Sequence, residues 1–166
     1  MNMRKNHPAR RPLTWIACAS FSTYLLTGCS SPPVKSFFAT KLDANVVVAA
    51  NTNPDPSGRA SPIVVRVYEL KAAQAFQSAD FPTLFDKEAN VLGNDLVARD
   101  EYEFAPGAKT HIVRNPNPET RFIGVIAAYR SIADAKWRAL YQVVESKTNE
   151  INIVVEQQAV LINQSN

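Results

Sequence analysis

The residues that most often carry out catalysis are few and scattered in this 166-residue sequence. Beyond the first 28 residues there is one histidine, His111, and no G-x-S-x-G motif to supply a serine nucleophile. Glu101 and Glu103 would share one face of a strand about 7 Å apart, a spacing compatible with glycosidic acid/base chemistry. Paired glutamates before a Pro-Gly turn are more often a solvated strand edge, and one histidine with scattered acids is no metal site. We therefore predict no enzyme, no metal and no cofactor.

Cys29, in contrast, stands in a context that specifies its chemistry. The stretch Leu26-Thr27-Gly28-Cys29 resembles a bacterial lipobox, in which an aliphatic and two small residues precede a cysteine. The thiol takes a diacylglycerol, and cleavage before the cysteine frees its amine for a further acyl chain. Two or more chains give stable membrane anchoring where one does not. We predict that Cys29 is the lipid attachment site, with an unmodified cysteine as the alternative.

The first 28 residues have the layout of a cleaved export signal. A basic segment, Met1 to Arg11, precedes an apolar stretch that is too short and polar for a confident membrane span. An uncleaved N-terminal anchor is the alternative. Removal of the signal would discard Cys18, leaving no disulfide. It would also remove four of the 18 basic residues, leaving 14 against 15 acidic ones. The positive charge of the whole chain is therefore no evidence for nucleic-acid binding.

Residues 29–40 are predicted to be the acylated cysteine and a short tether, followed by one folded domain over residues 41–166. About ten residues span at most ~35 Å, so the folded part would stay close to the membrane. Residue 30 is Ser rather than Asp. By resemblance to sorted lipoproteins, this favours the outer membrane.

From residue 41 onward, short apolar or alternating segments are separated by turn signals, which predicts a mainly β, two-sheet β-sandwich. The most apolar run, Phe122 to Tyr129, should be a central strand. The segments are residues 42–50, 63–70, 95–104, 110–114, 122–129, 137–144, 151–156 and 159–162.

A segment at about residues 71–92 breaks this pattern and predicts two short helices. Lys71 to Ser78 has good helix formers and no β-branched residue. Asp80 before Phe81-Pro82 is a plausible N-cap, and Leu92-Gly93 is typical of a helix end. We expect the apolar stripe of this insertion to pack on a sheet, with a ligand pocket as the alternative. The stripe is Phe76, Phe81, Leu84 and Phe85.

The segment Asn51 to Pro62, NTNPDPSGRASP, is a long loop between two strong strands. Such a loop is either functional or a tolerated insertion. It has no large apolar residue, so its affinity for a partner would depend on its backbone, its shape, Asp55 and Arg59.

These features together resemble the TssJ (SciN) family, the outer-membrane lipoproteins of the bacterial type VI secretion system. The resemblance starts at the lipobox and covers nearly all of the chain after it. It is carried in order by residues 53–55, 58–59, 61–70, 80–81, 84, 92–96, 106–107, 123–125, 129–130 and 137–138.

The resemblance implies a transthyretin-like β-sandwich with a short helical insertion. It also implies an outer-membrane lipoprotein that holds the periplasmic C-terminal region of the inner-membrane protein TssM. With TssL, these proteins form an envelope-spanning complex containing multiple copies. In the family, the loop between the first two strands matters for the contact with TssM. Here the corresponding residues are Asn53, Pro54, Asp55, Pro56, Ser57, Gly58, Arg59, Ala60 and Ser61. The alternative is a periplasmic transthyretin-like lipoprotein that binds a small hydrophobic ligand or a cell-wall component.

Overall fold

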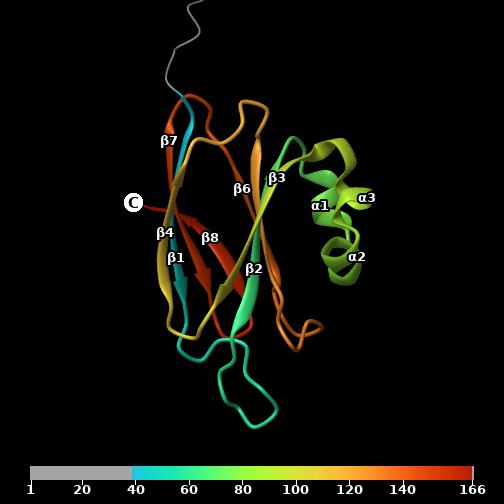
Figure 1. Cartoon of the computed structure of the whole chain (residues 1–166), viewed down its shortest axis with the longest axis vertical. Helices are drawn as coiled ribbons and strands as arrows, with labels where there is room; N and C mark the ends of the chain where they lie inside the picture. The colour runs from blue at the N-terminus through green and yellow to red at the C-terminus, as the bar shows by residue number, and fades with distance from the viewer. Residues whose placement is uncertain (1–38, 166) are drawn as a thin grey trace, which may run out of the picture. The chain divides into compact units, whose positions relative to one another are not determined.

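Two four-stranded sheets pack face to face in the computed structural model, which describes residues 39–165 (Figure 1). The first sheet has the strand order β4-β1-β7-β8 and the second β3-β2-β5-β6. The predicted two-sheet sandwich is therefore confirmed. Its strands are β1 Lys41–Val48, β2 Ile63–Leu70, β3 Leu96–Phe104, β4 Lys109–Arg114, β5 Phe122–Ala127, β6 Arg138–Gln142, β7 Thr148–Val155 and β8 Val160–Gln164.

β1 lies inside the first sheet and is paired on both sides. It runs antiparallel to β4 and parallel to β7, where the register extends from Lys41 opposite Thr148 to Val48 opposite Val155. Alternate β1 residues point into the core because successive side chains of a strand face opposite ways. The buried set in β1 is Leu42, Ala44, Val46 and Val48.

β5 is buried on both faces, unlike β1. It lies between β2 and β6, and Ile123 to Ala127 are all buried. One face packs on the first sheet and the other is covered by the helical insertion, so a continuous apolar run replaces the usual alternation. The prediction of a central strand here is confirmed, although the strand ends at Ala127 rather than Tyr129.

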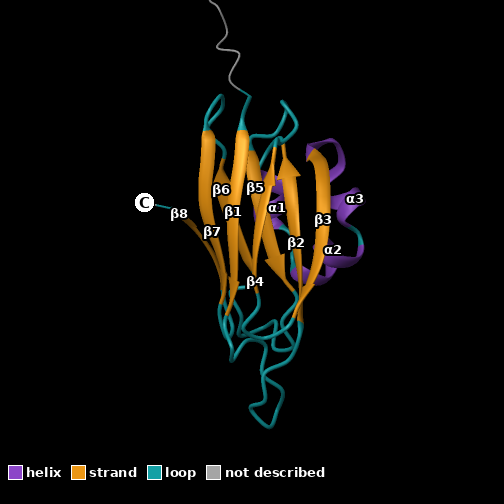
Figure 2. Ribbon diagram, turned by 60° about the vertical axis from the view of Figure 1, so that its left-hand side comes forward, coloured by secondary structure: helices purple, strands orange, loops and turns teal. Residues whose placement is uncertain are grey.

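The helical insertion covers the outer face of the second sheet (Figure 2). It contains α1 Gln74–Ser78, α2 Phe81–Asp86, α3 Glu88–Leu92 and the 3₁₀ turn η1 Gly93–Asp95. Asp80 caps α2 as predicted, its carboxylate accepting from the Thr83 N–H at 2.8 Å. The prediction of two helices was wrong, because the insertion contains three α-helices. The backbone leaves helical geometry at Lys87, which separates α2 from α3.

Apolar packing and two arginines hold this insertion on the sheet. Phe76 and Leu84 are fully buried against strand side chains, so the predicted stripe packs on the sheet. Arg66 of β2 donates to the Phe85 carbonyl at 2.5 Å and lies 3.8 Å from the centre of the Phe85 ring. Arg138 of β6 donates to the Ala79 carbonyl at 2.7 Å. Each arginine thereby satisfies a carbonyl near a helix end.

Gly124 in β5 is required by this packing. A Cβ at that position would lie 2.8 Å from Cζ of Phe76 and 3.1 Å from Cδ1 of Leu70. We expect Gly124→Ala to lower the free energy of unfolding by about 1–3 kcal/mol through overpacking. Urea unfolding of the full chain measures this, and Phe76→Leu is the matched second variant. Because the smaller side chain makes room, Gly124→Ala should cost less in the Phe76→Leu background; an equal cost would contradict the packing explanation.

Candidate partner-binding loop

The loop of residues 51–62 connects the two sheets at one end of the sandwich. It leaves β1 of the first sheet and enters β2 of the second. Because it follows the last residue of β1, it lies at the opposite end of that strand from Lys41 (Figure 1). The structure thus places the predicted contact residues, Asn53 to Ser61, together on one projecting segment.

The base of this loop is fixed by buried polar residues. The Thr52 hydroxyl donates to the Glu156 carbonyl at 2.9 Å, and the Asn53 N–H donates to the Gln157 carbonyl at 3.0 Å. The Asn53 side chain donates to the Pro62 carbonyl and accepts from the Arg130 N–H, both at 2.8 Å. Asn53 has a φ of +48°, which asparagine tolerates better than most residues. The base is therefore tied to the loop after β5 and to the β7–β8 turn.

The tip of the loop is organised around the Asp55 carboxylate. Oδ1 of Asp55 accepts from the Ser57 hydroxyl at 2.6 Å and from the N–H groups of Ser57 and Arg59 at 2.9 and 3.0 Å. Oδ2 pairs with the Arg59 guanidinium, at 2.9 Å from Nη2. Gly58 has a φ of +82° and closes the turn by donating its N–H to the Asp55 carbonyl. The tip is thus a closed turn, although it lacks an apolar core.

The predicted contact residues divide into two groups. Asn53 and Ser61 are buried and hold the base, since the Ser61 N–H donates to the Thr52 carbonyl at 3.2 Å. Residues 54–60 are the part a partner can reach, and the Arg59 side chain is 82% exposed. This tip offers a guanidinium, backbone groups and two prolines, which suits recognition of a protein surface rather than catalysis.

An open depression of about 600 Å³ lies beside the loop. It is lined by Ala49, Asn51, Asp134, Lys136 and residues 156–159. Sequence reasoning missed this surface because three separate connections form it. The predicted strand segments 151–156 and 159–162 leave Gln157 and Gln158 as the turn between them, but nothing local indicates that this turn lies beside the loop.

Two other polar residues considered from the sequence, His111 and Glu101, have structural partners. His111 Nε2 lies 2.6 Å from Asp43 Oδ1, and this hydrogen bond lowers the pKa of Asp43. Glu101 pairs with Arg66 at 2.6 Å, which lowers the pKa of Glu101. The Arg138 guanidinium lies 4.7 Å from the Trp137 ring centre. Within residues 39–165, no cluster of three His, Cys, Asp or Glu side chains offers a metal site.

The sequence from residue 40 to residue 158 matches the family model described as type VI secretion lipoprotein, VasD, EvfM, TssJ, VC_A0113. The chain belongs to this family of type VI secretion lipoproteins. The resemblance inferred from the sequence is thus confirmed. The family consists of type VI secretion lipoproteins, which are membrane-associated through lipid.

Solved structures give the same result for the fold of this lipoprotein. TssJ1 from Pseudomonas aeruginosa is 36% identical with a TM-score of 0.75, over 77% of this chain and 98% of that chain. Serratia marcescens Lip, a membrane-bound component of the type VI secretion system, is 23% identical with a TM-score of 0.70, over 76% and 98%. A chain in the structure of the T6SS protein TssM C-terminal domain from EAEC is 20% identical with a TM-score of 0.63, over 75% and 98%. No curated protein matched the sequence.

The predicted lipid site Cys29, the predicted signal and the predicted tether as far as residue 38 lie outside the described residues. Among the residues that are described, no helix is both long and apolar enough to cross a membrane.

The hydrogen bonds to Asp55 generate a prediction about pH. The Ser57 hydroxyl, followed by the Arg59 N–H, lowers the pKa of Asp55 from 3.8 to about 2. A lowered pKa means that the carboxylate stabilises the folded tip above pH 3.8 and that this contribution is lost as the pH falls through about 2. The amide proton shifts of Ser57 and Arg59 should therefore titrate by NMR with a midpoint near 2. Asp55→Asn is the control, because its amide does not titrate; a midpoint at 3.8 would contradict the arrangement.

Proposed function

We propose that this lipoprotein is the outer-membrane anchor of a type VI secretion membrane complex, with TssL in the same complex. Its loop of residues 51–62 binds the periplasmic C-terminal region of TssM. Family membership supports the secretion role. Matching chains in the structures called Type VI membrane complex and TssM C-terminal domain support the choice of partner. The observation that carries the proposal is the fixed, exposed loop tip at one end of the sandwich.

The direction of β1 suits an anchor whose partner-binding loop lies at the end of the sandwich away from the outer membrane. Cys29 precedes β1 by 12 residues, so the chain that carries the lipid would enter the sandwich at the end where β1 begins. The eight residues of β1 then extend for about 26 Å, at roughly 3.3 Å per residue, before the loop begins. A partner that rises from the inner membrane would meet the loop end first.

The loop tip alone is too small for a stable interface. Specific interfaces bury about 800 Å² on each partner, which requires roughly 20–30 residues. The depression beside the loop, with Lys136, Asp134 and the β7–β8 turn, supplies adjoining surface. The predicted interface is therefore the whole loop end of the sandwich, with the tip at its most projecting point.

Loss of the lipid site is expected to separate anchoring from folding. Cys29→Ser should give a protein with unchanged circular dichroism that no longer sediments with outer membranes, because the hydroxyl takes no diacylglycerol. Fractionation of membranes after a high-salt wash measures this, and Cys18→Ser is the matched control that should stay membrane-bound. A Cys29→Ser protein that remains in the washed outer-membrane fraction would contradict the assignment.

Charge reversal at the loop tip is expected to weaken the complex with TssM. Arg59→Glu puts a second carboxylate beside Asp55 and removes an exposed guanidinium, the group enriched at interface hot spots. We expect at least a tenfold increase in Kd for the purified TssM periplasmic region, measured by calorimetry with the full chain in detergent. Lys147→Glu, an equal charge change at the opposite end of the sandwich, should leave the Kd unchanged. Equal effects of the two variants would argue for general electrostatics instead of loop contact.

A further inference from the structure

The two long edges of the sandwich are built differently. At one edge, β3 and β4 are consecutive strands that cross between the sheets, and Arg114 of β4 pairs there with Asp100 of β3 and Glu69 of β2. At the other edge, β6 and β8 are the outermost strands of their sheets. They are joined at one end, where Lys136 donates to the Gln158 carbonyl at 2.9 Å and accepts from Val160 at 2.8 Å. Beyond that bridge, no strand ladder connects them within the described residues.

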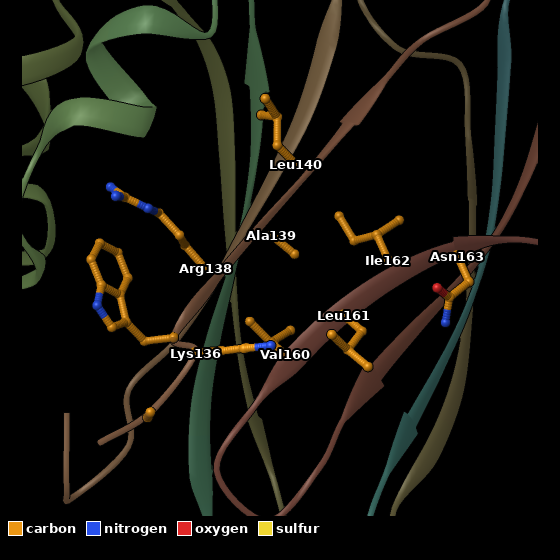
Figure 3. A pocket seen from close by; sticks show the side chains of 10 residues that line it. Lys136, Arg138, Ala139, Leu140, Val160, Leu161, Ile162 and Asn163 are labelled. Atoms are coloured by element: carbon orange, nitrogen blue, oxygen red, sulfur yellow. The ribbon is translucent and has the colours of Figure 1, made fainter. Parts of the chain in front are cut away.

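A groove of about 470 Å³ opens between these two strands (Figure 3). Ala139 and Leu140 of β6 line one side, and Leu161 and Ile162 of β8 line the other. Ala139 and Ile162 pack at the margin of the main core and are only partly buried. The interior of the sandwich is therefore incompletely covered along this edge.

Main-chain groups of both strands point outward from the free edges of their sheets, along which the groove lies. The Trp137 carbonyl accepts from the Ala127 N–H of β5, and the Val143 N–H donates to the carbonyl of Arg121, just before β5. Because alternate residues of an antiparallel strand bond to opposite sides, Leu140 and Gln142 direct their N–H and C=O groups toward the unpaired edge of the sheet, and Leu140 also lines the groove. The Ser165 N–H bonds to Glu150 of β7, so Ile162 and Gln164 face outward by the same argument. Such unpaired edges are templates for a further strand.

The groove continues into the surface next to the loop. Lys136 lines both the groove and the depression beside residues 51–62, and Val160 in the groove follows Ala159 in the depression. A chain bound at the loop end can therefore continue directly into the groove, because the two hollows adjoin at Lys136.

We propose that the β6/β8 groove receives an extended segment of the protein that the loop binds, added as a strand. This inference rests on the proposed function. The segment carries apolar side chains at alternate positions, which cover Ala139 and Ile162, while its backbone pairs with the strand edges. A folded second copy cannot supply this strand, because a strand that pairs with both β6 and β8 must have both of its sides unpaired. Each edge strand of this fold has only one unpaired side.

Hydrogen exchange tests the proposal on the full chain in detergent, with and without the purified TssM periplasmic region. The proposal expects at least tenfold slower exchange at the amides of Leu140, Gln142, Ile162 and Gln164 in the complex, together with protection of the loop. A complex that protects the loop and leaves these four amides unchanged overturns the inference but not the proposed function. Failure to form any complex overturns both. Protection that appears without TssM and increases with protein concentration indicates self-association and overturns the inference.

A backbone variant gives an independent measurement. Gln142→Pro removes an outward N–H from an exposed edge position, where proline is tolerated, and Gln142→Ala changes only the side chain. We expect Gln142→Pro to raise the Kd about tenfold and Gln142→Ala to leave it unchanged. Exchange of the remaining amides in the free variant reports that it is folded. Equal affinity of folded Gln142→Pro and the unaltered chain would overturn the proposal.

Discussion

Burial of one face of each sheet against the other is the constraint on which the rest of the structure depends. A one-residue slip of β1 would place Asp43 and Asn45 in the core and expel Leu42 and Val46, so the register has one acceptable solution. Fully burying each such aliphatic side chain is worth about 1.5–3 kcal/mol. A fixed register determines where each strand ends. The positions of the loops that carry the proposed contacts are determined by these strand ends.

Buried polar groups then shape the connections at both ends. At the loop end, the Tyr129 hydroxyl donates to the Ala159 carbonyl at 2.6 Å, close to the bonds made by Thr52 and Asn53. At the opposite end, Asn149 accepts from the Val144 N–H at 2.7 Å and donates to the Val144 carbonyl at 3.0 Å. A buried polar group left unpaired costs about 1–3 kcal/mol, so these bonds each favour one loop conformation. The surface proposed to bind the partner is therefore largely ordered in the free protein.

Local chemistry made much of the fold predictable. The alternation in β1 and β7, the continuous apolar run of β5 and the Asp80 cap are all visible within a few residues. The break between α2 and α3 at Lys87 could not be predicted, because the residues around it are compatible with one longer helix. The parallel pairing of β1 with β7 joins segments about 100 residues apart and depends on tertiary packing.

The candidate site was predictable in a similar, partial way. The unusual composition of residues 51–62 indicated a special loop, and Asp55 and Arg59 were recognised as side chains on which binding of a partner would depend. The role of Asn53 as a base residue could not be inferred, since its partners Arg130 and Gln157 are distant in sequence. Function entered through resemblance, because the site contains no catalytic chemistry to interpret.

The place of β1 has a mechanical consequence. A load applied between the end where β1 begins and the loop end of the molecule is directed along the axis of this strand. The hydrogen bonds to β4 and β7 lie across that axis on both sides, over the pairs from Lys41 to Val48. They are therefore loaded in shear and share the force together, whereas strands peeled apart from one end release their bonds one at a time. If the protein acts as the proposed anchor, the strand order of the first sheet makes it stiffest in the direction in which the complex would pull it.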